Sequence, residues 1–319
     1  MASFYRRQVL QEALNIVWQK KYLWFIGFFA GLVAYGGEAD FFFRNVNGIS
    51  QLQNYLIAIR ETVKAGDADV FLHQLRLFVS SNPTSAVSYV VMILLIVAVF
   101  AWLIIISQAT IVRIVGRTVQ KKPTGLFDGL AEGSSKIWSI LAMNIIVKLF
   151  TAALWVIFVI IPATTYFLNG QFAWALVTSL GWFAISIPIS IVISFLMKFS
   201  LAYIVLRDEQ AVLSLRDGWK LFQKNWLVSL EVAFLVYLFN LVVSIVVAGV
   251  ALLFIQPFSP AGLVTLLIVL AAVLGFVSSF SYAAWTIVFF KLQEGKTESR
   301  IGRWTNNLVN FAGPKKIAS

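Results

Sequence analysis

The sequence contains no cysteine and a single histidine, His73. The missing cysteines exclude disulfides, thiolate metal sites and cysteine nucleophiles, and one histidine disfavours a histidine-based metal site. Only 12% of the 319 residues are charged, whereas 60% are hydrophobic and the mean hydropathy is +0.86. Soluble domains carry roughly twice that share of charge. The composition therefore predicts a membrane protein that crosses the bilayer several times.

The motifs of the common enzyme classes are also missing. The sequence has no phosphate-binding loop, no His-Glu-x-x-His, no nucleophile elbow and no acid pair suited to an intramembrane aspartyl protease. Asp128-Gly129 is similar to the start of a lipid head-group phosphotransferase motif, but the further aspartates that its metal site needs do not follow. We therefore expect no catalytic residue, no cofactor and no metal, and predict that the protein is not an enzyme.

Long hydrophobic runs dominate the chain and predict an all-α integral membrane fold with six transmembrane helices. A hydrocarbon core of ~30 Å needs about 20 helical residues. The first run is shorter, so it is either a span that packs closely through Gly27-x-x-x-Gly31 or a re-entrant segment. A second stripe of small residues, Ala271, Gly275 and Ser279, lies in the last run. The predicted spans are residues 22–36, 86–114, 137–162, 172–206, 227–255 and 262–290.

The segments between the spans have their own patterns. Residues 37–85 form the only sizeable polar region and predict a small extracytoplasmic helical hairpin. Amphipathic helices at the membrane surface are predicted within residues 1–21, 115–136 and 207–226, and residues 291–319 form a tail. Pro188 is expected to kink the fourth span, and the whole chain of 1–319 is predicted to be one membrane domain.

The basic residues lie where they orient a membrane protein. A net charge of +11 could indicate nucleic acid, but 19 of the 25 Lys and Arg fall on one side of the predicted spans, in residues 1–21, 113–136, 207–224 and 291–319. An excess of Lys and Arg in short loops marks the cytoplasmic side. Both termini are therefore predicted to be cytoplasmic, and no nucleic-acid partner is expected.

One stretch, residues 211–227, sets a pattern that recurs. On a helix, Leu215, Trp219 and Phe222 share one face and a row of basic residues flanks it, as in helices at the membrane–water interface. Aligning Lys20, Lys136 and Lys224 places an aromatic residue two positions later in each case, namely Tyr22, Trp138 and Trp226. We predict three pseudo-repeated units, each an interfacial helix followed by a helical hairpin. Convergence is the alternative, because Lys and Trp favour any cytoplasmic interface.

The stretch Leu213-Ser-Leu-Arg-Asp-Gly-Trp-Lys-Leu-Phe-Gln-Lys-Asn-Trp226 resembles the signature of the six-span membrane-protein family related to the glycerophosphoryl diester phosphodiesterase membrane domain. Trp18-Gln-Lys-Lys-Tyr-Leu-Trp-Phe-Ile-Gly27 resembles the start of such uncharacterised bacterial proteins. The resemblance implies a bacterial plasma (inner) membrane protein. The family's role in lipid metabolism comes from a separate catalytic domain, so no catalytic residue is carried over.

Polar residues within the predicted spans are the first candidate site. Lys148, Lys198 and Glu231 would lie ~15, ~13 and ~8 Å deep at ~1.5 Å per residue, and ionisable groups at such depth face protein or water. One interpretation is a polar cavity that passes an ion or an anionic solute. The other is a buried pair of Glu231 with Lys198 that locks two helices, plus a snorkelling Lys148. Asn144 and Asn240 complete the candidate cluster.

The second candidate site is the basic row Arg216, Lys220 and Lys224, which would contact anionic lipid head groups or else serve only to orient the chain. The preferred function is a non-catalytic protein that organises lipids or partner proteins at the inner membrane face. The alternative is a small-solute or ion transporter or channel that uses the intramembrane cluster. The expected partners are the lipid bilayer and a protein partner or a second copy of the chain.

Overall fold

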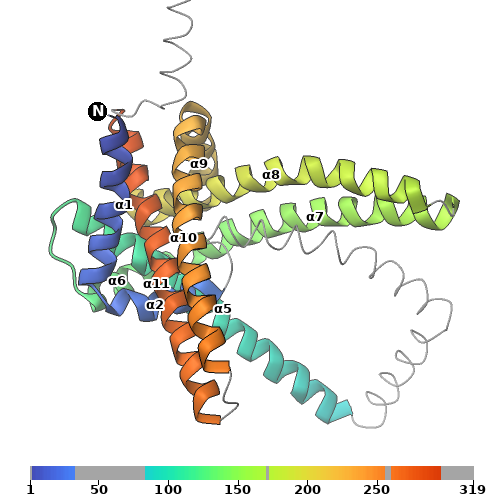
Figure 1. The fold of residues 1–319 in the computed structure, drawn as a ribbon, viewed down its shortest axis with the longest axis horizontal. Helices are drawn as coiled ribbons and strands as arrows, with labels where there is room; N and C mark the ends of the chain where they lie inside the picture. The colour runs from blue at the N-terminus through green and yellow to red at the C-terminus, as the bar shows by residue number, and fades with distance from the viewer. Residues whose placement is uncertain (1, 33–82, 170–171, 256–259, 296–319) are drawn as a thin grey trace, which may run out of the picture. The chain divides into compact units, whose positions relative to one another are not determined.

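The computed structural model describes residues 2–32, 83–169, 172–255 and 260–295, and all regular structure in these ranges is α-helical (Figure 1). The predicted hairpin of residues 37–85 lies outside the described residues except for its last three positions, and so does most of the tail of residues 291–319. The helices are α1 (Ala2–Gln19), α2 (Tyr22–Leu32), α5 (Pro83–Val119), α6 (Leu126–Ser135), α7 (Ile137–Asn169), α8 (Phe172–Arg207), α9 (Ala211–Lys224), α10 (Trp226–Ile255) and α11 (Pro260–Gln293).

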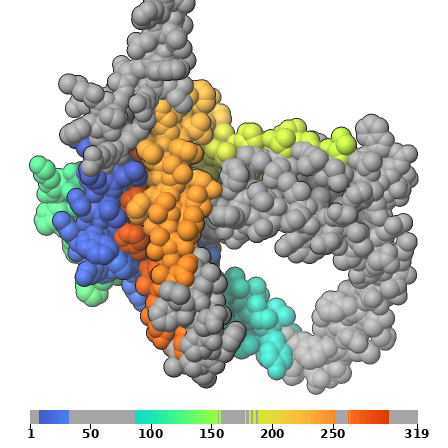
Figure 2. All heavy atoms as spheres, in the orientation of Figure 1, coloured from blue at the N-terminus to red at the C-terminus, as the bar shows by residue number. Residues whose placement is uncertain are grey.

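Five of these helices, α5, α7, α8, α10 and α11, are long and apolar enough to cross a membrane. Their apolar side chains are also extensively exposed. Every side chain from Val87 to Phe100 of α5 is exposed, and so are Leu230, Phe234, Leu238 and Val242 of α10. Figure 2 shows α10 in orange along the surface. Soluble monomers rarely expose contiguous apolar surface of this extent. The chain is therefore a multi-pass membrane protein.

Two prolines occupy different positions in their helices. Pro83 is the first residue of α5, a position where its missing N–H and fixed φ do no harm. Pro188 lies inside α8, which continues as one helix from Phe172 to Arg207.

The helix α2 has 11 residues and spans only ~16 Å, less than the thickness of a hydrocarbon core. Residues 33–36 of the predicted first span lie outside the described residues.

The described residues belong to two compact units, one with residues 2–32, 104–147, 191–255 and 260–295 and the other with 83–103, 148–169 and 172–190. In the first unit α11 packs against α1, α2 and α10. The contact between α2 and α11 is backbone against backbone. A Cβ at Gly27 would overlap the carbonyl oxygen of Gly275, and the Ser279 hydroxyl donates to the Leu23 carbonyl. Small residues permit this approach, which within a bilayer supplies contact energy that hydrophobicity cannot.

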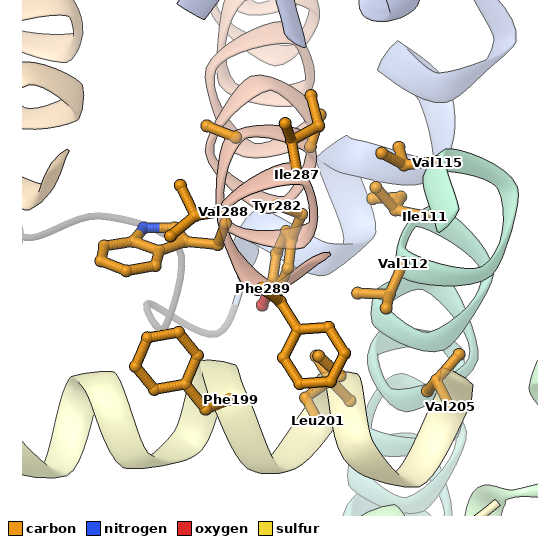
Figure 3. Close-up of a cluster of buried hydrophobic side chains, with 14 of the residues drawn as sticks. Ile111, Val112, Val115, Phe199, Leu201, Val205, Tyr282, Ile287, Val288 and Phe289 are labelled. Carbon is orange, nitrogen blue, oxygen red and sulfur yellow. The ribbon is translucent and has the colours of Figure 1, made fainter. Parts of the chain in front are cut away.

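The core of the same unit lies where α5, α8 and α11 meet (Figure 3). Each helix contributes large apolar side chains that are almost completely buried, and aromatic pairs such as Tyr203 with Phe289 and Phe199 with Trp285 pack edge to face. Such ring pairs contribute ~0.5–1.5 kcal/mol beyond their buried area. The core side chains labelled in the figure are Ile111, Val112, Val115, Phe199, Leu201, Val205, Tyr282, Ile287, Val288 and Phe289.

Three helices, α1, α6 and α9, each precede a more apolar helix after a break of one or two residues. The breaks lie at residues 20–21, at Lys136 and at Asn225. At the last one the Asn225 side chain donates to the Leu221 carbonyl 3.1 Å away, which satisfies a backbone group that the end of α9 leaves without a helical partner. All three breaks fall at the predicted Lys-x-aromatic steps.

Candidate functional site

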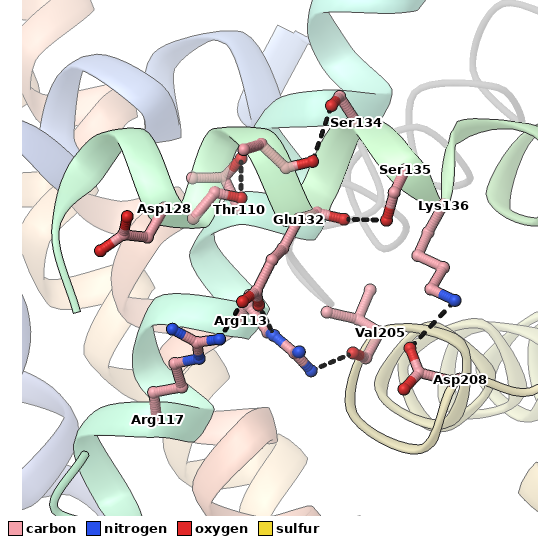
Figure 4. Close-up of polar contacts among 12 residues, drawn as sticks. Thr110, Arg113, Arg117, Asp128, Glu132, Ser134, Ser135, Lys136, Val205 and Asp208 are labelled. Carbon is pink, nitrogen blue, oxygen red and sulfur yellow. Dashed lines mark hydrogen bonds and ion pairs between the residues drawn. The ribbon is translucent and has the colours of Figure 1, made fainter. Parts of the chain in front are cut away.

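A charged cluster joins α5, α6 and the end of α8 (Figure 4). Arg113 and Arg117 both pair with the Glu132 carboxylate, and Arg113 also donates to the Val205 carbonyl at 2.9 Å. Lys136 pairs with Asp208 at 3.0 Å. The two arginines and Glu132 are each partly buried, so their charge-assisted bonds are less screened than those of an open surface pair.

Every charged group of this cluster is paired within the cluster. Arg113 and Arg117 are one helical turn apart on α5, and the single carboxylate of Glu132 accepts from both of them. Guanidinium groups engaged in this way hold α6 against α5 and offer little to a ligand. We therefore assign the cluster a structural role, although the sequence pattern alone does not distinguish its arginines from the other basic residues.

Lys20, at the break between α1 and α2, has a different environment. Its ammonium lies 2.9 Å from the Thr118 hydroxyl and 3.4 Å from the Thr124 hydroxyl, at the end of α5 and just before α6. The Thr118 hydroxyl donates to the Ile114 carbonyl at 2.7 Å, so it accepts from Lys20. Burial lowers the pKa of Lys20 below its ordinary value of 10.5. Thus hydroxyls, and no carboxylate of the described residues, hold this ammonium.

The segment between the two threonines turns sharply. Lys121 adopts a left-handed φ of 57°, and the backbone N–H groups of Lys121 and Lys122 donate to the carbonyls of Thr118 and Arg117. This is the hydrogen-bond pattern that ends many helices with glycine, and a side chain in that conformation costs roughly 1–2 kcal/mol. A lysine therefore occupies a position where the backbone favours glycine.

A polar pocket lies beside Lys20, between α1, α5 and α11. It has a volume of about 400 Å³, and its wall includes the ion pair of Lys291 with Glu12 at 3.4 Å. Three side-chain amides, one hydroxyl and this pair give it a polar, almost neutral lining. Sequence reasoning missed the pocket, for which the only signal was the polar face of residues 1–21. The lining residues are Gln8, Gln11, Glu12, Asn15, Ile16, Thr118 and Lys291.

The predicted intramembrane residues fall into both compact units. Asn144, Lys198, Glu231 and Asn240 lie in the unit organised around α11, whereas Lys148 lies in the other and has an exposed side chain. Asn144 is buried, and its amide donates to the Ile140 carbonyl one turn earlier. The amide of Asn144 is thus satisfied within its own helix.

Lys198 and Asn240 are the most deeply buried polar residues of the predicted cluster. Lys198 is 7% exposed, and its ammonium lies 4.6 Å from the centre of the Trp285 ring. A cation over an indole face contributes ~2 kcal/mol when water is excluded. Asn240 is 2% exposed, and neither its amide nitrogen nor its oxygen has a hydrogen-bond partner among the described residues. Buried amides are normally hydrogen-bonded, and the amide of Asn240 departs from this rule.

The basic row of α9 lies on its outer side. Arg216, Lys220 and Lys224 are exposed, and Lys220 pairs with Asp217 at 2.8 Å. The helix instead buries its small residues Ala211, Ser214 and Gly218 together with Leu221. The aromatic face that the sequence singles out is divided, because Trp219 and Trp226 are exposed whereas Leu215 and Phe222 pack against the core.

An acid at the start of α9 is poorly solvated. Glu209 has one carboxylate oxygen that is buried without a hydrogen-bond partner among the described residues. Burial, reinforced by the neighbouring charge of Asp217, raises the pKa of Glu209 above its ordinary value of 4.5. The described ranges contain no group of three acids or histidines arranged to hold a metal ion.

The comparisons with known proteins found no match to a protein-family model, a curated protein or a solved structure. The resemblance to the six-span family therefore remains a prediction from the two short motifs.

Proposed function

We propose that the protein is a non-catalytic multi-pass membrane protein that organises lipids or partner proteins at the inner face of a bacterial plasma membrane. In this proposal six spans form three units of interfacial helix and hairpin, with both termini in the cytoplasm. The strongest support is α9, which is anchored through its small residues and leaves Arg216 and Lys224 exposed beside the exposed indoles of Trp219 and Trp226.

This combination of groups suits an anionic membrane surface. Basic side chains contribute ~1 kcal/mol each near such a surface, and indoles favour the depth of the lipid head groups. Asp217 neutralises Lys220 within the helix, so Arg216 and Lys224 carry the net charge of the row.

The test uses the full chain in nanodiscs of phosphatidylcholine with increasing phosphatidylglycerol. Native mass spectrometry counts the anionic lipids that stay bound. The variant Arg216→Gln/Lys224→Gln should lose about five-fold in retention for each charge removed, while Lys220→Gln should change it less because Lys220 is already paired. Equal retention by the wild type and the double variant, or no preference for phosphatidylglycerol, would reject lipid organisation by α9.

The second candidate function is a small-solute or ion transporter or channel. The observation that favours it is Asn240, a fully buried amide without a partner among the described residues, in the same unit as the buried Lys198. A conducting or substrate-bound state would supply water or solute to such a group.

Proteoliposome flux assays separate the two functions. If the protein is a transporter, Asn240→Leu abolishes flux while the chain still folds. If Asn240 is instead a buried amide with no functional role, the same substitution raises the melting temperature, because it removes a polar group without a hydrogen-bond partner. In that case transport is unchanged. Lys198→Met provides a second variant, because it keeps the length of the side chain and removes the charge.

A further inference from the structure

We propose that Lys20, Lys21, Thr118, Lys121, Lys122 and Thr124, here called the Lys20 cluster, bind the phosphate-bearing head group of an anionic phospholipid. This inference deepens the proposed function and rests on it, but it places the lipid at a composite site outside α9. The site combines the break between α1 and α2 with the turn that follows α5, about 100 residues later in the chain.

Two hydrogen bonds bring the basic residues together. Lys20 donates to Thr118 and Thr124, and Lys121 and Lys122 are among the five residues between these two threonines. A chain advances at most ~3.6 Å per residue, so the backbone of both lysines lies within roughly 11 Å of a threonine bonded to Lys20. Lys21 follows Lys20 directly. Four ammonium groups therefore belong to one small region.

Nothing in the described part of the chain neutralises this charge. Glu12 pairs with Lys291, Glu132 with the two arginines of α5, Asp208 with Lys136 and Asp217 with Lys220. Asp128 accepts from the backbone of Gly125. The described residues show no carboxylate paired with any lysine of the Lys20 cluster. Four lysines without a paired carboxylate among the described residues favour the binding of an external anion.

The hydrogen-bond inventory favours phosphate as that anion. An ammonium has three donors, and the threonine hydroxyls accept two of those of Lys20. Its third N–H remains for a ligand. Thr124 accepts from Lys20 and keeps its own O–H as a donor, whereas the O–H of Thr118 is already used by the Ile114 carbonyl. A phosphate oxygen is a strong acceptor for both of the remaining donors.

Exposed aromatic residues indicate that the phosphate belongs to a lipid. Trp18 lies two residues before Lys20 and is 58% exposed, and Phe127, three residues after Thr124, is 81% exposed. Large apolar side chains beside a cationic site favour the interface of a bilayer over bulk water. A soluble phosphate would gain nothing from them.

The experiment uses native mass spectrometry of the full chain with phosphatidylglycerol and phosphatidylcholine as probes. Lys20→Gln and Lys121→Gln/Lys122→Gln should each lower phosphatidylglycerol retention, by about five-fold per charge removed. Arg207→Gln is the matched control, because it removes one charge from an exposed side chain outside the cluster and should leave retention unchanged. Thr124→Val tests the hydroxyl donor with no change in charge, and it should weaken binding by less than Lys20→Gln.

The outcomes distinguish this site from the proposed function. If the α9 variant loses lipid and the Lys20-cluster variants do not, the site is wrong and the proposed function stands. If neither set loses lipid, both fail. If glycerol phosphate at millimolar concentration displaces phosphatidylglycerol completely, the site takes a soluble phosphate and the lipid assignment is overturned. If Lys20→Gln impairs folding, Lys121→Gln/Lys122→Gln decides the question, because both side chains are exposed.

Discussion

The helices α6 and α9 pack through the same kind of glycine contact, but their charged side chains face different surroundings. Each presents a glycine to a hydroxyl residue of the long helix before it. A Cβ at Gly133 would lie 2.9 Å from the Thr110 hydroxyl, and one at Gly218 would lie 2.8 Å from the Ser200 hydroxyl. The two hydroxyls then donate to backbone carbonyls, Thr110 to Gly129 at 3.4 Å and Ser200 to Ser214 at 3.1 Å.

The charges of the two helices are arranged in opposite ways. On α6, Glu132 faces inward to the arginines of α5, whereas on α9 the exposed Arg216 and Lys224 face outward. A close backbone contact can therefore seat a short helix without help from its charges. The charges are then available either to fix the helix further, as in α6, or to meet something outside the bundle, as in α9.

The largest expected effect comes from breaking the shared glycine contact. Gly218→Val and Gly133→Val should each lower the free energy of unfolding by ~1–3 kcal/mol, because a Cβ would crowd backbone as well as side-chain atoms. Thermal unfolding in detergent, followed by size-exclusion chromatography, measures the loss. Similar losses at both positions would sharpen the comparison.

A control for this prediction is Gly181→Val in α8. A Cβ there meets nothing within 4 Å, so the substitution should change the melting temperature little. If Gly218→Val unfolds like the wild type, then α9 is not seated by close contact, and the likeness between the two helices is superficial.

The sequence predicted the elements that leave a local pattern. Long apolar runs predicted the helices that are able to span a membrane, and the Lys-x-aromatic steps predicted where α1, α6 and α9 end. The two small-residue stripes around Gly27 and Gly275 pack on each other, because only small side chains allow two backbones to touch. Each of these patterns is local in the chain, whereas the pairing of the two stripes with each other is not local and was not predicted.

What the sequence could not predict depends on distant residues or on the membrane as a solvent. The bonds of Lys20 to Thr118 and Thr124 and the pocket beside them join segments about 100 residues apart, and no periodicity encodes them. The aromatic stripe of α9 predicted an interfacial helix, but it did not identify Ala211, Ser214 and Gly218 as the residues through which the helix packs. An apolar side chain has a similar free energy whether it faces lipid or the protein interior, so apolar periodicity does not identify the face that packs against other helices.

An intermediate effect is expected from the acids of the two helices. Glu132→Gln leaves Arg113 and Arg117 without their carboxylate and should cost ~1 kcal/mol, because both arginines are partly exposed and water screens part of the loss. Asp217→Asn removes a pair in which Lys220 is well exposed and should cost at most ~0.5 kcal/mol. Thermal unfolding of both variants at low and high salt gives the two values. Equal losses would mean that the acid of α9 fixes its helix as firmly as that of α6, which would remove the difference between them.

The smallest effect concerns Glu209 and the pH dependence of stability. Because burial and Asp217 raise the pKa of Glu209 in the folded protein above 4.5, the folded state holds its proton more tightly than the unfolded state. The stabilisation from the neutral acid is complete below pH 4.5 and is lost as the pH rises through the raised value. Glu209→Gln should remove this decline, so its melting temperature should vary less than that of the wild type just above pH 4.5. At pH 7 the variant should be more stable by no more than ~0.5 kcal/mol, as for most surface substitutions.

Asp217→Asn should reduce the change of melting temperature over the same pH range only partly. It removes the charge of Asp217, which is the smaller cause of the raised pKa of Glu209, and leaves the burial of Glu209 unchanged. If Glu209→Gln has the same pH profile as the wild type, then this carboxyl is well solvated. The start of α9 would then carry no desolvated charge, and α9 would not differ from α6 in this respect.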